Sequence, residues 1–358
     1  MDAMIFHAAY RLNPNSVSAS AIRPRRMKQA FADADYEVFD LTGTAAERRH
    51  KFRELRTAVR EGKRFSFMYS ESATIPPMIG DPNHFPHPFL DAQIFRFLKN
   101  QGIPQAVFYR DIYWRFPDYV ERVGRLLATV MRPMYLAELA LYKKYMTKVY
   151  VPSQQMATYI PELNGIDVGA LPPGGYNTDA SASAHPINLL YVGGIGPHYQ
   201  LDELVAAVKV LPDVSLTICT SADGWAGVAD QYAVEGFSNI DVVHRSGDGL
   251  HQLFQRSNIA VIMVKPSEYW GFAVPVKLFE YVNYGKPVLV SRGTLAGELV
   301  ESHGWGWVID NDRTEITSAL SELAANPAQI DAAAKQVMAD RGGHTWLARA
   351  EQVAEDLS

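Results

Sequence analysis

The stretch Leu190–Pro197, LYVGGIGP, is typical of a β-strand that runs into a glycine-rich turn, and a helical pattern follows at Leu201–Val210. Similar short apolar runs alternate with helical patterns along the whole chain. We expect strands at 4–7, 37–41, 65–69, 106–110 and 148–151, and in the second half at 188–192, 215–219, 241–244, 259–264, 287–291 and 305–309. This alternation predicts an α/β fold with two doubly wound parallel sheets.

A linker composition separates the two halves. The segment Leu171–Tyr176 reads LPPGGY and a polar stretch follows it, while 358 residues is about twice the length of a typical domain. We therefore expect Rossmann-like domains at 1–175 and 176–340, facing a central cleft, with a C-terminal helix at about 340–358 that packs back on the first. Because open α/β sheets bind ligands beyond the carboxyl ends of their strands, functional residues should follow strands.

The composition excludes several classes of protein. Apolar residues make up 47% of the chain and charged residues 20%, which excludes a largely disordered chain. A single cysteine, Cys219, excludes an internal disulfide and a cysteine-based metal cluster, and it favours the cytoplasm. The N-terminus lacks the pattern of a secretory signal, and no apolar run is long enough to span a bilayer.

The net charge of −5 hides an asymmetry. Residues 1–180 carry +5 and the remainder −10, so the first half is the candidate for meeting an anionic surface. Within it, the segment 121–148 has apolar residues at helical spacing among several Arg and Lys residues. This segment is either a core-packed helix or a basic amphipathic helix that lies in the headgroup layer of an anionic membrane.

The glycine-rich turn has the chemistry of a phosphate site. Gly193, Gly194 and Gly196 let the backbone approach a phosphate closely, and the N–H groups at the start of the next helix favour an anion. A dinucleotide fingerprint would need a further glycine near Tyr199 and an acid after the next strand, which ends at Cys219. A purely structural turn is the alternative.

The segment 266–281, PSEYWGFAVPVKLFEY, is followed by GKPV at 285–288. A helix should begin near Pro275, and Lys277 and Glu280, three positions apart, then share one face near its positive N-terminus. A diphosphate uses both the helix dipole and an ammonium, and a carboxylate suits the hydroxyl pair of a ribose. The alternative is a solvated lysine beside a glutamate.

The segment 108–117, FYRDIYWRFP, follows a strand of the first half. Asp111 is our candidate for the base that takes a proton from an acceptor hydroxyl, and the surrounding aromatic residues would raise its pKa by desolvation. Arg110, Tyr113 and Trp114 are candidates for gripping an anion or stacking on a sugar ring. The alternative is an ion-paired Asp111 that caps a turn, and Glu71, after the preceding strand, is the competing base.

Small residues and cations follow the first strand. Ser18 and Arg23 are candidates for binding the acceptor or a phosphate. Arg23 could equally be a solvated cation at the start of a helix.

Together, these motifs resemble the donor signature of GT-B glycosyltransferases, in which Pro-x-Lys-x-x-Glu-Tyr precedes Gly-Lys-Pro-Val. The chain is similar to family 4 and to the xanthan-type glucuronosyltransferases over most of residues 170–310. The resemblance implies two Rossmann-like domains, a donor nucleotide on the second, no bound metal, Lys277 on the diphosphate and Glu280 on the ribose. The other expected donor contacts are Arg245, Glu268, Tyr269, Trp270, Gly271 and Phe272.

Two departures from the retaining members of this group favour inversion. Those members carry a glutamate where this chain has Phe272, and an Arg and a Lys where it has Gly194 and Gln200. We therefore expect a cytoplasmic, inverting hexosyl- or glucuronosyltransferase of polysaccharide biosynthesis, peripheral at the inner face of the membrane. It would use a UDP-sugar and a glycan or lipid-linked acceptor, with no nucleic acid, cofactor or metal. A nucleotide-sugar epimerase and a non-catalytic carbohydrate-binding protein remain alternatives.

Overall fold

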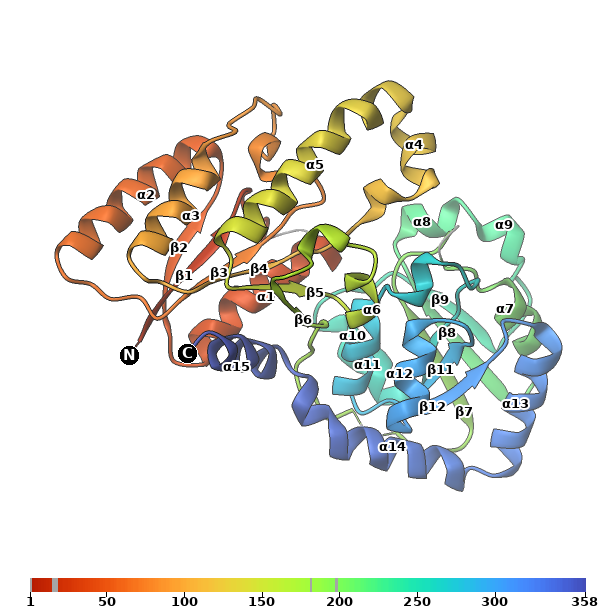
Figure 1. The fold of residues 1–358 in the computed structure, drawn as a ribbon. Helices are drawn as coiled ribbons and strands as arrows, with labels where there is room; N and C mark the ends of the chain where they lie inside the picture. The colour runs from red at the N-terminus through yellow and green to blue at the C-terminus, as the bar shows by residue number, and fades with distance from the viewer. Residues whose placement is uncertain (1, 15–18, 181, 197–198) are drawn as a thin grey trace. The chain divides into compact units, whose positions relative to one another are not determined.

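The chain forms two compact units in a computed structural model that describes residues 2–14, 19–180, 182–196 and 199–358 (Figure 1). The N-terminal unit comprises Met1–Pro172 and Trp346–Ser358, and the C-terminal unit comprises Pro173–Thr345. The C-terminal unit thus begins three residues before, and ends five residues after, the limits that we expected from the sequence.

A six-stranded parallel sheet in the order β2-β1-β3-β4-β5-β6 forms the centre of the N-terminal unit. Its strands are β1 (Ala3–Ala8), β2 (Glu37–Thr42), β3 (Met68–Glu71), β4 (Gln105–Phe108), β5 (Lys148–Val151) and β6 (Asp167–Ala170). We expected five of them. The sixth, β6, lies at the edge with every residue at least partly exposed, so its sequence lacks the apolar run by which buried strands are recognised.

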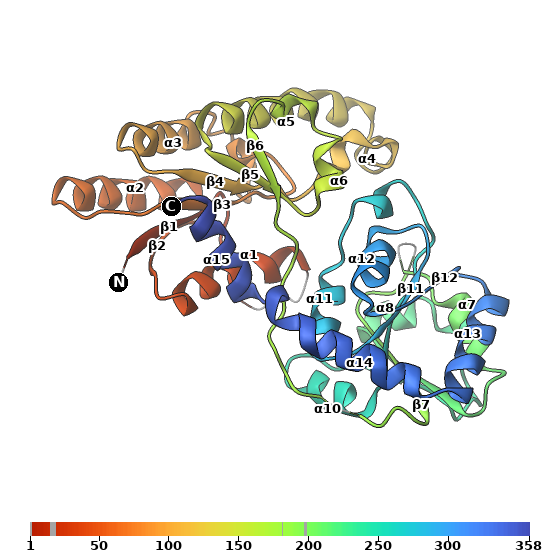
Figure 2. The same ribbon diagram turned by 60° about the horizontal axis from the view of Figure 1, so that its bottom comes forward.

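Helices cover both faces of this sheet: α2, α3 and α5 lie on one face, and α1 and α15 on the other (Figure 2). The helices of the unit are α1 (Ala19–Asp33), α2 (Ala45–Arg60), α3 (Leu90–Asn100), α4 (Pro117–Val123), α5 (Arg125–Tyr145), α6 (Gln154–Ala157) and α15 (Trp346–Asp356), with single turns at Pro77–Ile79, Tyr113–Arg115 and Pro161–Leu163. The C-terminal helix α15 packs along α1, and the Tyr150 hydroxyl on β5 donates to the Asp356 carboxylate at 2.7 Å.

The C-terminal unit contains a second six-stranded parallel sheet, in the order β12-β11-β10-β7-β8-β9. Its strands are β7 (Ile187–Val192), β8 (Val214–Cys219), β9 (Ile240–Val243), β10 (Ile259–Ile262), β11 (Val288–Ser291) and β12 (Gly306–Ile309). All six strands that we expected in this half are present. Since β7 lies between β8 and β10, the chain changes direction across the sheet there, and α/β sheets bind ligands at such a switch point.

Two apolar clusters, one on each face, hold helices against the second sheet. One includes Leu204 of α7 and Leu320 of α13, and the other includes Leu278 of α11 and Val300 of α12. The helices of the unit are α7 (Asp202–Val208), α8 (Ala222–Ala226), α9 (Ala229–Tyr232), α10 (Gly249–Arg256), α11 (Val276–Asn283), α12 (Leu295–His303), α13 (Arg313–Ala325) and α14 (Ala328–Asp340), with single turns at Tyr269–Gly271 and Arg341–His344.

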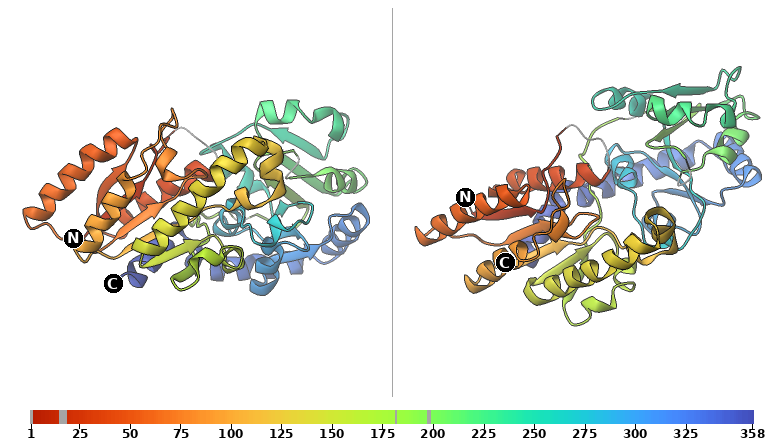
Figure 3. Two further views of the ribbon diagram at one scale, coloured as in Figure 1. Left: turned by 45° about the horizontal axis from the view of Figure 1, so that its top comes forward. Right: turned by 90° about the horizontal axis from the view of Figure 1, so that it is seen from above.

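The helix α5, yellow in Figure 3, is the longest in the N-terminal unit, with 21 residues. Together with α4 it follows β4, so α4 and the start of α5 lie at the carboxyl edge of that sheet. Across the described ranges, no helix has both the length and the apolar character that crossing a bilayer requires.

Candidate functional site

The ammonium of Lys277 is buried at the switch point of the second sheet. Lys277 is the second residue of α11, which follows the extended Pro275, and its side chain is 8% exposed. Its Nζ donates to the Tyr191 hydroxyl at 3.0 Å and lies 4.2 Å from the centre of that ring and 3.5 Å from the centre of the Tyr199 ring. Cation–π attraction and one hydrogen bond therefore hold the ammonium between two tyrosines.

Burial changes the acidity of this group. Desolvation lowers the pKa of Lys277 to about 7, and the negative charge of Glu280 only partly opposes the shift. The side chain thus gives up its proton more readily than an exposed lysine does, and a bound anion would favour the ammonium. This combination of a buried cation and a perturbed pKa is typical of a functional site.

The glycine-rich turn after β7 lies directly against this ammonium. Gly193 has φ +140°, and a Cβ atom built on it would lie 2.8 Å from the Lys277 Nζ. The end of β7 is fixed by Tyr281 of α11, whose hydroxyl accepts from the Val192 N–H at 2.9 Å. Gly196, at φ +138°, exchanges two backbone hydrogen bonds with Tyr199. Only glycine at position 193 leaves room for the ammonium beside the backbone.

The loop between β10 and α11 contributes fewer exposed contacts than we expected. Trp270 and Phe272 are buried: Trp270 packs edge-on against Tyr199 at 5.3 Å, and Phe272 packs against Tyr269 at 5.2 Å. Trp270 thus supports the tyrosine that contacts Lys277, whereas Phe272 packs within the loop. Among the predicted contacts in this loop, Glu268 and Gly271 are exposed and Tyr269 is half-buried.

Two further predicted donor residues flank this region. Glu280 lies one turn after Lys277 on α11 and is half-buried. Arg245, after β9, is exposed and donates to the side-chain oxygen of Gln252 at 3.0 Å. Gly194 is exposed and has open space around its α-carbon.

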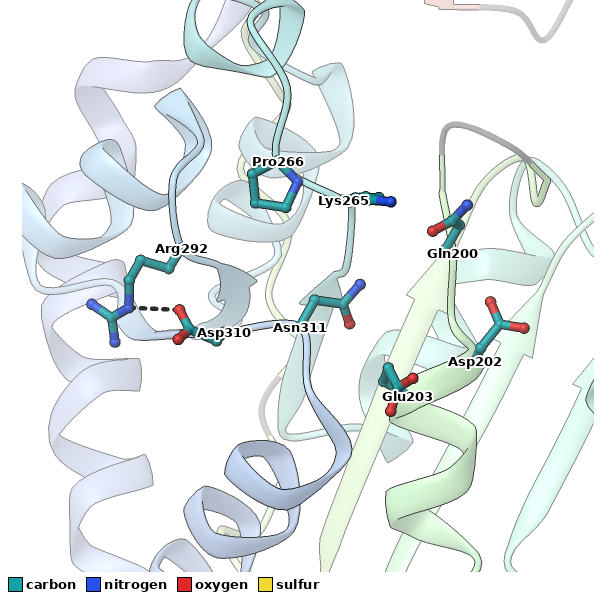
Figure 4. A pocket seen from close by; sticks show the side chains of 8 residues that line it. All are labelled: Gln200, Asp202, Glu203, Lys265, Pro266, Arg292, Asp310 and Asn311. Carbon is teal, nitrogen blue, oxygen red and sulfur yellow. Dashed lines mark hydrogen bonds and ion pairs between the residues drawn. The ribbon is translucent and has the colours of Figure 1, made fainter.

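A polar pocket of about 480 Å³ opens at the same edge of the sheet (Figure 4). Its lining residues follow strands β7, β10, β11 and β12: Gln200, Asp202, Glu203, Lys265, Pro266, Arg292, Asp310 and Asn311. Arg292 and Asp310 form an ion pair at 2.9 Å across one wall. Among these residues, only Gln200 and Pro266, the first residue of the segment 266–281, belong to the patterns that we recognised in the sequence.

In the N-terminal unit, Asp111 lies just beyond β4 and is half-buried. Its Oδ1 accepts the backbone N–H of Tyr113 at 2.9 Å, and Tyr113 is the first residue of the single turn Tyr113–Arg115. Burial raises the pKa of Asp111, although backbone N–H groups and the charges of Arg110 and Arg122 act in the opposite direction. Asp111 thus combines a desolvated carboxyl with a hydrogen bond to the turn that follows it.

The aromatic residues after Asp111 are engaged with neighbours in their own unit. Trp114 stacks on Tyr135 at 4.9 Å, donates to the Tyr109 hydroxyl at 2.9 Å, and lies 4.5 Å from the Arg115 guanidinium. Tyr113 is half-buried and lies under the guanidinium of Arg122 at 4.5 Å. A sugar platform at this position would thus have to use Tyr113 or the edge of Trp114.

Glu71 forms a buried ion-pair cluster. Its Oε1 accepts from Arg23 Nε at 3.1 Å and from the Tyr69 hydroxyl at 2.7 Å, and its Oε2 lies 3.6 Å from Arg110. Arg23 is only 4% exposed, and its guanidinium also lies 3.4 Å from the centre of the Phe108 ring.

This arrangement corrects two of our expectations. Arg23 is neither a solvated cation nor an open phosphate contact, because its charge is used to balance a buried carboxylate. Glu71 itself is 1% exposed, which makes it a poor candidate for receiving the proton of an incoming hydroxyl. The remaining predicted residue, Ser18, lies outside the described residues.

The structure thus brings Lys277 and Gly193 together in one unit. In the other unit, Arg110 and Asp111 follow β4, and Glu71 is the last residue of the neighbouring strand β3. Sequence reasoning missed the roles of Tyr191 and Tyr199. The one indication of these roles in the sequence was that Lys277 lies in an otherwise apolar, buried stretch of α11. A buried lysine requires polar or aromatic partners.

Residues 186–326 match the family model described as glycosyl transferases group 1. A comparison with curated protein sequences gives no significant match.

Similar solved structures cover nearly the full length of the chain. Sucrose-phosphate synthase from Thermosynechococcus elongatus has a TM-score of 0.65 at 17% identity, covering 98% of this chain and 97% of that one. HepE from Anabaena, solved in complex with UDP, has a TM-score of 0.66 at 13% identity, covering 100% and 99%. WaaG, a glycosyltransferase involved in lipopolysaccharide biosynthesis, has a TM-score of 0.60 at 12% identity, covering 99% of each. The shared fold is the GT-B fold.

A glycine pair tests the packing around Lys277. Gly193→Ala should lower the free energy of unfolding by about 1–3 kcal/mol, because φ is positive there and the new Cβ meets the ammonium. Gly194→Ala is the matched control and should change it by less than about 1 kcal/mol, since the site is open. Urea unfolding without ligand measures both. Equal stability of the two variants would contradict this packing.

Proposed function

We propose a sugar donor, a catalytic mechanism and a cellular location for this chain. The chain is a glycosyltransferase of the GT-B fold, with a group 1 domain at residues 186–326. The donor is a UDP-sugar, and its diphosphate binds where Lys277 lies against the Gly193 turn. This juxtaposition is the observation that carries the proposal, since it offers an ammonium, backbone N–H groups and the start of α11 to one anion. HepE, with a similar fold, has been solved with UDP and with UDP-glucose.

In this proposal, Lys277 and the N-terminus of α11 stabilise the negative charge on the departing diphosphate. The acceptor hydroxyl attacks the anomeric carbon, the bond from that carbon to the diphosphate oxygen breaks, and UDP leaves. Asp111 takes the hydroxyl proton, and attack from the face opposite to the leaving group inverts the anomeric centre. No metal ion is needed, because the buried ammonium supplies the countercharge.

Burial supports the role of Asp111 as base. A raised pKa makes its carboxylate a stronger proton acceptor than an ordinary exposed aspartate. Glu280, which follows Lys277 by one turn, is the proposed partner of the ribose hydroxyls, with Glu268, Gly271 and Arg245 as the exposed contacts around them.

A patch on α4 and α5 points to an acceptor at a membrane surface. Met131 and Tyr135 face the core, while the neighbouring turns leave apolar and basic side chains exposed. We define the α4–α5 patch as Val120, Arg122, Arg125, Leu126, Leu127, Val130, Arg132 and Leu136. Leu126 is 83% exposed, and Leu127 and Val130 on the same helix are each 49% exposed. Several exposed apolar residues on one element indicate an interaction surface more strongly than a single one does.

The α4–α5 patch combines apolar side chains with arginines, and such a surface suits the headgroup layer of an anionic bilayer. We therefore propose that the chain binds peripherally to the inner face of the membrane and glycosylates a lipid-linked acceptor in polysaccharide biosynthesis. The involvement of WaaG in lipopolysaccharide biosynthesis is in keeping with this role.

Donor binding should depend on pH through Lys277. The ammonium form binds the diphosphate, and the pKa of the free enzyme's Lys277 is about 7. The affinity for UDP-glucose should therefore be constant well below pH 7 and fall by nearly tenfold per pH unit above it, as titration calorimetry between pH 6 and 8.5 would measure.

The variant Lys277→Met should bind UDP-glucose at least tenfold more weakly at pH 6 and lose this pH dependence. Lys335→Met removes an exposed lysine of α14 and should bind like the wild type. Wild-type affinity in Lys277→Met would contradict the proposed donor site.

The base can be tested by isosteric substitution. Asp111→Asn should leave UDP affinity unchanged and reduce turnover of the best substrate in a UDP-sugar screen by 100-fold or more, because general base catalysis contributes about 10²–10⁴. The comparison variant is Glu71→Gln. Undiminished turnover in Asp111→Asn would contradict the assignment, and a selective loss in a folded Glu71→Gln would transfer the role to Glu71.

Vesicle flotation tests the membrane proposal. The wild type should bind vesicles that contain phosphatidylglycerol, with salt weakening the binding, and should not bind vesicles of phosphatidylcholine alone. Leu126→Ser should weaken binding about tenfold or more, because a buried leucine contributes about 1.5–3 kcal/mol. The control Val210→Ser removes an exposed apolar residue of the other unit. Equal flotation of wild type and Leu126→Ser would contradict the proposal.

A further inference from the structure

We propose that His303, Asp340 and His344 form a binding site for a transition metal ion, and that zinc fits it best. One possible ligand atom from each residue lies within 4.8 Å of the other two. The three residues are the last residue of α12, the last residue of α14 and the end of the turn that follows α14. Two imidazoles and one carboxylate are a set that zinc takes readily, with water as a fourth ligand.

The His303 ring is held in an orientation that suits a ligand. Its Nδ1 lies 2.9 Å from the backbone oxygen of Leu299. A carbonyl oxygen only accepts hydrogen bonds, so this contact favours the proton on Nδ1 and leaves the lone pair of Nε2 for a metal. Metal-binding histidines are commonly oriented by such a backbone contact.

Trp305, which is fully buried, positions the other groups around it. Its Nε1 donates to Asp340 Oδ2 at 2.9 Å, and its ring stacks on His303 at 4.3 Å and meets His344 edge-on at 4.8 Å. A single buried side chain therefore contacts all three candidate ligands. This support is what distinguishes the cluster from a chance meeting of surface residues.

The three ligand atoms lie within 4.8 Å of one another and would have to move closer together around one ion. Asp340 Oδ2 and His344 Nε2 lie 3.9 Å apart. Ligand atoms about 2.0–2.1 Å from a tetrahedral zinc ion are separated by about 3.3 Å. Side-chain rotation supplies this difference, and all three residues are half-buried, so an ion can enter from solvent.

A metal here would stabilise the segment by which the chain leaves the C-terminal unit at Thr345. The backbone oxygen of His344 accepts from the Gly175 N–H at 3.0 Å and from Asn283 Nδ2 at 2.9 Å. The ion would join α12 to this hydrogen-bonded segment. The role is structural, involves none of the proposed donor contacts, and does not depend on the proposed function.

The test is zinc titration of the full chain after treatment with a chelator. The wild type should bind one zinc ion per chain in competition with a zinc-sensitive dye, show the visible absorption of tetrahedral Co²⁺ when cobalt replaces zinc, and melt at a higher temperature with zinc than without it. His303→Gln and Asp340→Asn should each weaken zinc binding at least tenfold and remove the thermal shift. Asp340→Asn keeps an oxygen that accepts from Trp305, so it should remain folded.

His50→Gln is the matched control. His50 pairs with Glu54 at 3.4 Å one turn along α2, as His344 does with Asp340, but it belongs to no three-ligand group among the described residues. Its zinc affinity should equal that of the wild type. Failure of the wild type to bind zinc, or equal binding by the wild type, His303→Gln and folded Asp340→Asn, would overturn the proposal, whatever the affinity for UDP-glucose.

Discussion

The arrangement of the C-terminal unit depends on the burial of one ammonium group. The buried ammonium of Lys277 contacts the faces of two tyrosine rings and makes a single hydrogen bond instead of being hydrated by water. This loss of hydration lowers its pKa, and the remaining contacts compensate its charge only in part. A group in this state binds an anion more strongly than an exposed lysine does, because the cost of desolvation has already been met in folding. The glycine at position 193 is a direct consequence, since any larger residue there would displace the ammonium.

Topology explains why the ammonium lies where it does. In the second sheet, β7 has β10 on one side and β8 on the other, so the loops that follow β7 and β10 diverge at the carboxyl edge and leave the start of α11 between them. In the loop after β10, Trp270 packs against Tyr199, the ring that contacts the lysine, and Phe272 packs against Tyr269. The N-terminal unit uses its strand ends differently: Glu71 forms ion pairs with both Arg23 and Arg110, and the desolvated carboxyl of Asp111 is half-buried.

Much of this could be predicted from the sequence, and the remainder has physical reasons. Apolar runs revealed the buried strands, and Pro275 with the spacing of Lys277 and Glu280 revealed the start of α11. The edge strand β6 was missed because partly exposed strands carry no such run. The burial of Arg23 was missed because its partner Glu71 lies 48 positions away, and pairing over that distance is set by tertiary packing. The same limit hid the cluster of His303, Asp340 and His344.

The central claim is that a nucleoside diphosphate binds between the start of α11 and the glycine-rich turn after β7. Hydrogen exchange of the backbone amides with and without UDP tests this claim most directly. The account predicts slower exchange of backbone amides at 193–196 and 276–280 when UDP is present, with Lys277→Met removing the effect. Unchanged exchange in both segments at saturating UDP, or protection confined to other parts of the chain, would contradict it.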